Sequence, residues 1–339
     1  MDAIFKQLFY EMEKMRDTVL VTVIEAEGSA PRGVGAQMLV GQTGRLTGTI
    51  GGGPAEYEAL QAAAGLMEKK SSERRAYNLS VGGETGAVCG GSISVWLQFI
   101  PAGSREWYEL ARRLVERLAS HSGGWLVQRM DGGAPSLLDE TGGLILGRDA
   151  APELSASAFG RTEKAFSLAL PIGERAVIFG AGHCTTALVP VLRTVGFRPV
   201  VMDDRPEFAS AERFPDAEAV ICGDYLHIAD FIQLSPEDYV VVMTSGHNHD
   251  FEVQEQVLRT ELAYVGVIGS RRKTAYVNAR LREAGIGEDA IASVHTPIGT
   301  AIKAVTPEEI AISIAGEMIC ERATRREKNG TVAHRCPMH

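Results

Sequence analysis

The sequence predicts an α/β protein with an N-terminal glycine-rich α/β domain and a C-terminal domain built on a doubly wound parallel sheet. Short β-branched runs alternate with helical patterns along most of the 339 residues, which is typical of α/β folds. Residues 175–205, RAVIFGAGHCTTALVPVLRTVGFRPVVMDDR, follow the order strand, glycine turn, helix, strand and acid. That order is the first unit of a dinucleotide-binding fold, so the C-terminal domain is predicted to be Rossmann-like.

Within this unit each special residue has an expected role. Gly180 permits the turn, and Gly182 lets a ligand phosphate approach the free N–H groups of the following helix. His183 either donates to such a phosphate or caps the helix. Asp203, or its neighbour Asp204, lies where a ribose hydroxyl would be held. The fingerprint is incomplete, because Thr185 stands at the position of the third glycine.

Composition limits the function classes. A hydrophobic content of 45% and a charged content of 23% are ordinary for a globular protein, and the net charge of −9 argues against nucleic-acid binding. No apolar run predicts a membrane span, and five cysteines without a CxxC pair fit a reducing cytoplasm. We expect the first domain at 1–150, a linker at 151–171, the Rossmann-like domain at 172–321 and a basic tail at 322–339.

The first glycine loop lies in GSAPRGVGAQMLV (28–40), after a predicted helix over 2–15 and a strand over 19–26. Arg32 stands at its centre, framed by glycines, as in an anion clamp that combines a guanidinium with exposed backbone N–H groups. A glycine-rich hairpin carrying a solvated arginine is the alternative, and this loop alone favours it.

The second glycine loop, Gly51-Gly52-Gly53, follows a predicted hairpin (37–40 and 45–50) and precedes a helix over 55–68. Glycines before a helix N-terminus, with Pro54 near its first position, are typical of phosphate binding. Glu56 falls in the first helical turn. It either favours the helix dipole or takes part in ligand or proton chemistry beside the glycines.

The third glycine cluster surrounds Cys89, between strands predicted over 74–81 and 92–100. A thiol in a glycine turn is poorly packed by its neighbours, and thiolates suit soft metals and sulfur chemistry. A small buried cysteine is the alternative, and the sequence leaves both interpretations open.

Two more loops follow predicted parallel strands in the second half. Residues 245–250, SGHNHD, follow the strand 239–244, and His247, His249 and Asp250 there are interpreted as a ligand-facing loop rather than a metal site. After the strand 263–268, Ser270, Arg271 and Arg272 precede a helix over 274–284 and predict an anion site. A strand is expected near 291–295, and Thr306 to Glu309 predict a capping box.

These motifs together resemble the XdhC/CoxI family of accessory proteins for xanthine dehydrogenase and related molybdenum hydroxylases. The segments that carry the resemblance are GSAPRGVGAQMLV (28–40), GTIGGGPAE (48–56), CGG (89–91), GAGH (180–183), DDR (203–205), YVGVIGSRRK (264–273) and PIGTAIKAVTPEEIAISIAGEM (297–318). The resemblance implies a cofactor chaperone rather than an enzyme. It would bind the molybdenum cofactor, as molybdopterin or its dinucleotide form, work with a cysteine desulfurase that supplies the terminal sulfur, and deliver the cofactor to an apo-hydroxylase of the xanthine dehydrogenase type.

On this resemblance, Cys89 lies next to the molybdenum or the transferred sulfur and is the metal-binding residue. The groups expected to hold the cofactor elsewhere are Arg32, Gly51, Gly52, Gly53, Glu56, Ser270, Arg271 and Arg272, with Gly180, Gly182, His183 and Asp203 lining the Rossmann crevice. A homodimer in the cytoplasm is expected.

The alternative is an NAD(P)-dependent oxidoreductase that uses Gly180, Gly182 and Asp203, with His247 or His249 as acid/base. Thr185 and three glycine loops outside the Rossmann unit count against it. A purely structural partner of the hydroxylase would leave so many anion-shaped loops unexplained.

Overall fold

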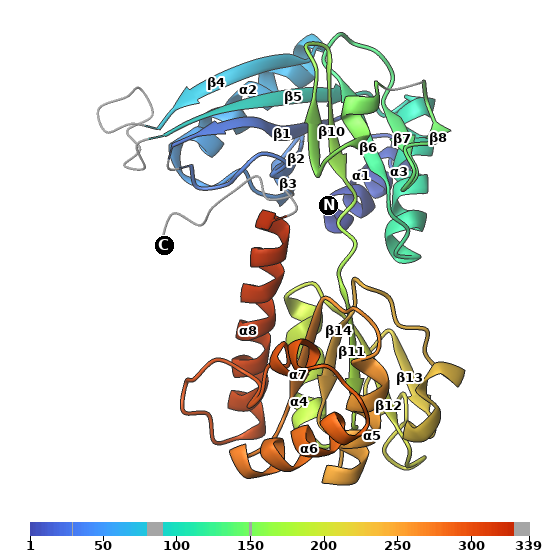
Figure 1. Ribbon diagram of the computed structural model, residues 1–339. Helices are drawn as coiled ribbons and strands as arrows, with labels where there is room; N and C mark the ends of the chain where they lie inside the picture. Colours follow the sequence, from blue (N-terminus) through green and yellow to red (C-terminus); the bar gives the residue numbers. More distant parts are fainter. Residues whose placement is uncertain (29, 80–90, 149–150, 329–339) are drawn as a thin grey trace. The chain divides into compact units, whose positions relative to one another are not determined.

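The computed structural model describes residues 1–28, 30–79, 91–148 and 151–328 (Figure 1). The chain forms two compact units: Met1–Ile172 together with the described residues from Arg326 on, and Gly173–Arg325. Both are α/β, and the second contains the predicted parallel sheet, so the predicted fold class is confirmed.

The first unit contains an antiparallel five-stranded sheet of order β3-β2-β1-β5-β4. Its strands are β1 (Thr18–Glu27), β2 (Gln37–Gly41), β3 (Gly44–Gly48), β4 (Glu73–Asn78) and β5 (Ser92–Ile100). Alternate residues of a strand face opposite sides. Val21 and Val95 therefore pack on one face with alanines of α2 (Gly53–Lys69), whereas Leu20 packs on the other with α1 (Asp2–Glu13) and α3 (Arg105–Ala119).

A second antiparallel sheet of order β8-β7-β6-β10-β9 completes the first unit. Its strands are β6 (Trp125–Arg129), β7 (Ser136–Leu138), β8 (Leu144–Leu146), β9 (Phe159–Arg161) and β10 (Ala165–Ala169). The predicted linker at 151–171 is therefore wrong, because it contains β9, β10 and the short helix η1 (Pro152–Ser155). The strands of this segment are only three to five residues long, too short to display a clear period.

The second unit is built on a parallel sheet of order β13-β12-β11-β14-β15. Its strands are β11 (Arg175–Phe179), β12 (Arg198–Asp203), β13 (Ala219–Cys222), β14 (Tyr239–Val242) and β15 (Tyr264–Val267). Ile178 and Val241 face α4 (His183–Thr194) and α8 (Pro307–Lys328), whereas Val177 and Val240 face α5 (His247–Val257) and η2 (Tyr225–Asp230). Helices on both faces make the sheet doubly wound.

Local predictions fail at three places in the second half. Residues 247–250 form the first turn of α5 rather than a loop, with Gly246 as its N-cap. Of the strand expected at 291–295, the first two residues end α7 (Glu288–Ala292), and His295 makes an isolated β-bridge to Gly266. The expected tail begins as helix, since α8 runs to Lys328. The run 291–295 is too short for its periodicity to separate helix from strand.

The helices α6 (Arg271–Glu283) and α8 begin with side-chain caps. The predicted capping box is confirmed: the Thr306 hydroxyl accepts from the Glu309 N–H at 3.3 Å, and the Glu309 carboxylate accepts from the Thr306 N–H at 3.1 Å. No helix among the described residues is both long enough and apolar enough to span a membrane.

Candidate functional site

The three glycine-rich segments of the first unit leave the first sheet at one end. Glu27, the last residue of β1, pairs with Ser92, the first residue of β5, and Ser92 also pairs with Asn78 at the end of β4. In the antiparallel sheet, β2 begins and β3 ends at this same end. Three connections therefore start from this end of the sheet: the loop that holds Arg32, the loop 48–53 and the connection from Asn78 to Ser92. Cys89 belongs to that connection but lies outside the described residues.

The first two glycine loops are in direct contact. Gly51 has φ +130°, and a Cβ on it would lie 2.7 Å from the Cβ of Pro31 and 3.5 Å from the backbone nitrogen of Arg32. A side chain at this position would therefore be strained and would push the loops apart. Gly52 and Gly53 are different, since open space surrounds the position of a Cβ on either residue.

Glu56 holds the second glycine loop from inside. Its side chain is buried, and Oε2 accepts hydrogen bonds from the Thr49 hydroxyl at 2.5 Å, the Ile50 N–H at 3.0 Å and the Gly52 N–H at 3.1 Å. Oε1 accepts from the Arg45 guanidinium at 2.7 Å. The Glu56 carboxylate thus occupies the position that a bound anion takes at a glycine-rich helix N-terminus.

These contacts also set the ionisation of Glu56. Burial by itself raises the pKa of the carboxyl group, but the hydrogen bonds from Thr49, Gly52 and Ile50 and the charge of Arg45 outweigh it. The pKa of Glu56 therefore lies below its ordinary value. A group that is ionised and fully hydrogen-bonded in this way stabilises the loop rather than transferring protons.

Arg32 is exposed, and no carboxylate among the described residues pairs with it. It lines a cavity of about 610 Å³ together with Gly48 and Thr49 of the second glycine loop and the apolar side chains of Val34 and Leu168. An unpaired guanidinium over an open cavity can bind a phosphate with two parallel hydrogen bonds.

In the second unit, the glycine turn after β11 has the predicted form. Gly180 has φ +110°, and a Cβ on it would lie 2.3 Å from the carbonyl oxygen of Met243. Gly182 is the N-cap of α4, with no side chain capping it and open space at its Cβ position. The buried hydroxyl of Thr185 donates to the carbonyl of Gly180. Thr185 therefore closes the turn by a hydrogen bond, where a third glycine would close it by tight packing.

Asp203 is fully buried beneath this turn. Its Oδ2 accepts from the Ala181 N–H at 2.7 Å, and the Arg205 guanidinium reaches both carboxylate oxygens, at 2.8 and 2.9 Å. Burial opposes ionisation, but the bonds from Arg205 and Ala181 prevail and lower the pKa of Asp203. The carboxylate therefore fixes the turn and Arg205.

Asp204, the other acid of the pair, is half-buried at the same edge of the sheet. Its carboxylate lies 3.9 Å from Arg205 Nε and 3.8 Å from His249 Nε2. His249 Nδ1 lies 2.8 Å from Glu252, and its ring centroid lies 5.4 Å from that of Tyr225. Asp204 is thus the acid of the pair that retains solvent access, the position needed to contact a sugar hydroxyl.

The three cationic residues after β15, which are Arg271, Arg272 and Lys273, differ in their exposure to solvent. Ser270 is the N-cap of α6, and its hydroxyl accepts from the Lys273 N–H at 3.3 Å. Arg271 and Arg272 are exposed in the first turn, whereas Lys273 turns inward and pairs with the buried Asp250. Arg271 and Arg272 remain as the cations of this helix N-terminus that face solvent.

The carboxyl edge of the parallel sheet gathers the predicted residues of the second unit, which are Gly180, Gly182, His183, Asp203, Ser270, Arg271 and Arg272. His183 is exposed at the first position of α4 and does not cap it, since Gly182 is the N-cap. Burial raises the pKa of Cys184 beside it, which keeps that thiol protonated.

Within the described part of the chain, no group of three or more His, Cys, Asp or Glu side chains is arranged to hold a metal ion. The sequence did not predict that Arg45 and Thr49 bind the carboxylate of Glu56, or that Arg205 binds that of Asp203. The pairing of Arg205 with Asp203 could have been predicted, because the side chain of an arginine two residues after a buried acid can fold back and bind its carboxylate.

The chain thus combines a parallel doubly wound sheet that carries a GxG turn with a second unit that presents glycine loops at one end of its sheet. Residues 176–318 match the model of the XdhC Rossmann domain, and residues 12–78 match that of the XdhC and CoxI family. One match lies in each unit. The chain belongs to the XdhC and CoxI family.

Relatives extend the likeness over nearly the whole chain. A Bacillus subtilis protein described as a probable subunit of xanthine dehydrogenase is 28% identical over 92% of this chain and 95% of its own length. The molybdenum cofactor insertion chaperone PaoD of Escherichia coli is 23% identical over 92% of this chain and 86% of its own. A crystal structure described as a xanthine dehydrogenase from Bacillus halodurans is 26% identical, with a TM-score of 0.77, and covers 95% of this chain and 96% of that chain.

Proposed function

We propose that this protein is an accessory protein that binds the molybdenum cofactor and delivers it to an apo-hydroxylase of the xanthine dehydrogenase type. The observation that carries the proposal is the common origin of three glycine-rich segments at one end of the first sheet. The names of the relatives support it, since one is a molybdenum cofactor insertion chaperone and another is a probable xanthine dehydrogenase subunit. The chain acts as a carrier, and the cofactor is its cargo.

The first unit fits the charged and sulfur-rich parts of such a cargo. Arg32, exposed over its cavity, binds the terminal phosphate, and the open space around Gly53 lets that phosphate approach the loop beside the N–H groups that Glu56 occupies. Cys89 supplies a thiolate next to the molybdenum or its transferable sulfur, because thiolates are the soft ligands of the side-chain set. Glu56 keeps the loop in shape rather than touching the cargo.

The Rossmann unit holds further anionic groups of the cargo. Gly182 and His183 present the free N–H end of α4, and Ser270, Arg271 and Arg272 present that of α6. A cofactor in its dinucleotide form offers the diphosphate and sugar for this edge, with Asp204 facing the sugar hydroxyls. A cysteine desulfurase as sulfur donor and a homodimer as the working form are part of the same proposal.

The geometry of Asp203 does not favour the NAD(P)-dependent alternative, which uses that carboxylate to hold the cofactor. Both oxygens of Asp203 are engaged by Ala181 and Arg205. Anaerobic calorimetric titration with the molybdenum cofactor, and separately with NAD(H) and NADP(H), separates the two functions. Cofactor binding with no nicotinamide heat supports the chaperone. Nicotinamide binding alone would overturn it and direct attention to His249.

Replacing Cys89 with alanine is expected to weaken cofactor binding at least about tenfold and to abolish activation of the apo-hydroxylase, because the metal-side ligand is lost. Calorimetry and a reconstitution assay measure the two effects. Cys320→Ala, which removes an exposed thiol from α8, is the matched control and should behave as the wild type. If Cys89→Ala binds and activates normally, the assignment of Cys89 is wrong.

A further inference from the structure

The outer face of α8 is apolar and exposed. The opposite face packs on the parallel sheet through side chains such as Ile314 and Met318, and Figure 1 shows α8 beside the sheet of the second unit. Over residues 310–325 every exposed position is uncharged, and these positions are Ile312, Gly316, Ile319, Cys320 and Ala323. The solvent-facing side of a helix normally carries charged and polar residues, so an outer face of this composition indicates a contact surface.

Four of these residues form a regular row along the helix, which we call the α8 row. Ile312, Gly316, Ile319 and Ala323 follow one another at intervals of four, three and four residues. This is the spacing of the positions through which two packed helices contact each other. Ile312 and Ile319 are 58% and 37% exposed, so association with another helix would remove their apolar surface from water.

Gly316 lacks a side chain for no reason within the described part of the chain. Its backbone is helical and α8 runs through it without interruption, so its conformation does not require glycine. A Cβ on Gly316 would meet only Thr300 Oγ1, at 3.7 Å, which is an ordinary van der Waals contact. A glycine in a helix interior destabilises the helix relative to alanine. The close approach of a second backbone at this point accounts for the glycine.

The α8 row is complementary to itself when two copies of the helix run antiparallel. In the register that places Gly316 of one copy opposite Ile319 of the other, Ile312 of one copy lies opposite Ala323 of the other. Each isoleucine of the row then faces a small residue of the second copy, and the two-fold symmetry repeats every contact. A parallel pair would instead set isoleucine against isoleucine and glycine against glycine, which leaves a gap at the glycine.

The charges at the two ends of α8 favour the same orientation. Its first turn carries Glu308 and Glu309, whereas residues 322–328 at its other end carry four cations and one carboxylate. An antiparallel pair brings the acidic first turn of each copy to the basic end of the other, and a parallel pair brings like charges together. Shape and charge therefore both select a second copy of this chain as the occupant of the face.

We propose that α8 forms the interface of a homodimer in which two α8 rows pack antiparallel about a two-fold axis. The inference supplies an interface for the homodimer that the proposed function includes, and it rests on that part of the proposed function alone. No residue of the row belongs to the glycine loops or to the carboxyl edge of the parallel sheet. Dimerisation and cofactor binding can therefore be measured separately, and either can fail while the other holds.

Sedimentation equilibrium of the full-length protein, without cofactor and under reducing conditions, measures dimerisation. We expect a dimer with a dissociation constant below about 100 μM. Ile319→Glu places a carboxylate opposite Gly316 of the other copy and should weaken the dimer at least about 100-fold. Gly316→Leu fills the space that Ile319 of the other copy needs and should weaken the dimer as much, without lowering the unfolding temperature, because leucine favours helix more than glycine does. Leu226→Glu, which changes an exposed apolar residue of η2, is the matched control and should dimerise as the wild type does.

Disulfide trapping tests the orientation of the two helices. Ile312→Cys and Ala323→Cys are prepared as separate proteins, each with Cys320→Ala to remove the neighbouring exposed thiol. After oxidation with glutathione disulfide, a mixture of the two should give a covalent dimer, because positions 312 and 323 lie opposite each other. Each variant alone should not, because its two cysteines lie about 16 Å apart along the helices. The proposal is overturned by a wild-type protein that stays monomeric up to about 100 μM, by an Ile319→Glu protein that dimerises normally, or by a single cysteine variant that cross-links to itself as readily as the mixture does.

Discussion

Replacing Glu56 with alanine is expected to lower the free energy of unfolding of the first unit by about 3 kcal/mol. The substitution leaves the N–H groups of Ile50 and Gly52, the hydroxyl of Thr49 and the guanidinium of Arg45 without their acceptor. Glutamine should cost only about 1 kcal/mol, because its carbonyl oxygen can take the place of Oε2 and only Arg45 then faces an amide. Thermal or denaturant unfolding measures both.

The exposed Glu68 on the same helix supplies the matched control, and Glu68→Gln should leave stability unchanged. The pH dependence is a second test. Because the pKa of Glu56 is lowered in the folded state, its contribution is complete above the ordinary glutamate pKa of about 4.3 and is lost as the pH falls through the folded value. The difference between wild type and Glu56→Gln should therefore be constant near neutral pH and shrink only in acid. A Glu56→Ala protein as stable as the wild type would contradict this account.

Replacing Asp203 with asparagine is expected to destabilise the Rossmann unit by about 3 kcal/mol, which corresponds to roughly 8 °C in its unfolding temperature. Both carboxylate oxygens accept from donors, so an asparagine amide meets an N–H in either orientation. Arg205 would also lose its bidentate partner. Differential scanning calorimetry measures the shift.

Asp204→Asn is the control for Asp203, since Asp204 is half-exposed and lies only at 3.8–3.9 Å from its charged neighbours. It should leave the unfolding temperature nearly unchanged. A result in which Asp203→Asn unfolds like the wild type would show that the buried carboxylate is dispensable. It would also reopen Asp203 as a free ligand for a ribose.

The Rossmann unit was predictable because its signals are local. A β-branched strand, a GxG turn and an apolar helix are each read within about ten residues, and their order determines a right-handed parallel unit. The strand 175–179 has the expected bounds. The burial of Asp203 could not be predicted from the sequence, because it depends on a contact with the N–H of Ala181, which lies 22 residues earlier in the chain.

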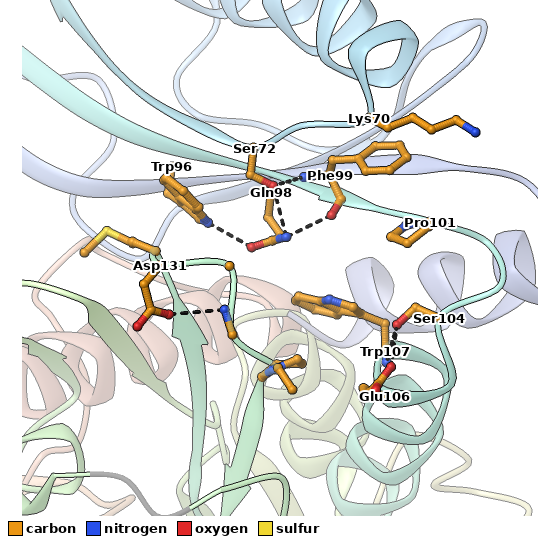
Figure 2. A pocket seen from close by; sticks show the side chains of 15 residues that line it. Lys70, Ser72, Trp96, Gln98, Phe99, Pro101, Ser104, Glu106, Trp107 and Asp131 are labelled. Atoms are coloured by element: carbon orange, nitrogen blue, oxygen red, sulfur yellow. Dashed lines mark hydrogen bonds between the residues drawn. The ribbon is translucent and has the colours of Figure 1, made fainter.

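The role of Glu56 illustrates the same limit in the first unit. Its place in the first helical turn is evident from the sequence, but its donors Thr49 and Ile50 reach it only because the loop curls back over the helix. The cavity of about 630 Å³ that Trp96 and Trp107 line (Figure 2) is less predictable still, since its other walls come from the segment after α2 and from the turn 130–135. No periodic pattern connects segments so far apart, and the short strands of the second sheet gave no clear period.

The tethered carboxylate of Glu56 has a consequence for ligand selection. This carboxylate is attached to the chain four residues after Gly52, so it competes with dissolved anions for the N–H groups of the loop at an effective concentration of roughly millimolar or more. Free phosphate, sulfate and small carboxylates in the surrounding solution must displace this resident competitor before they can occupy those donors. The loop thereby discriminates against abundant small anions, and only a ligand that gains additional attachment elsewhere, such as at Arg32, can outcompete it.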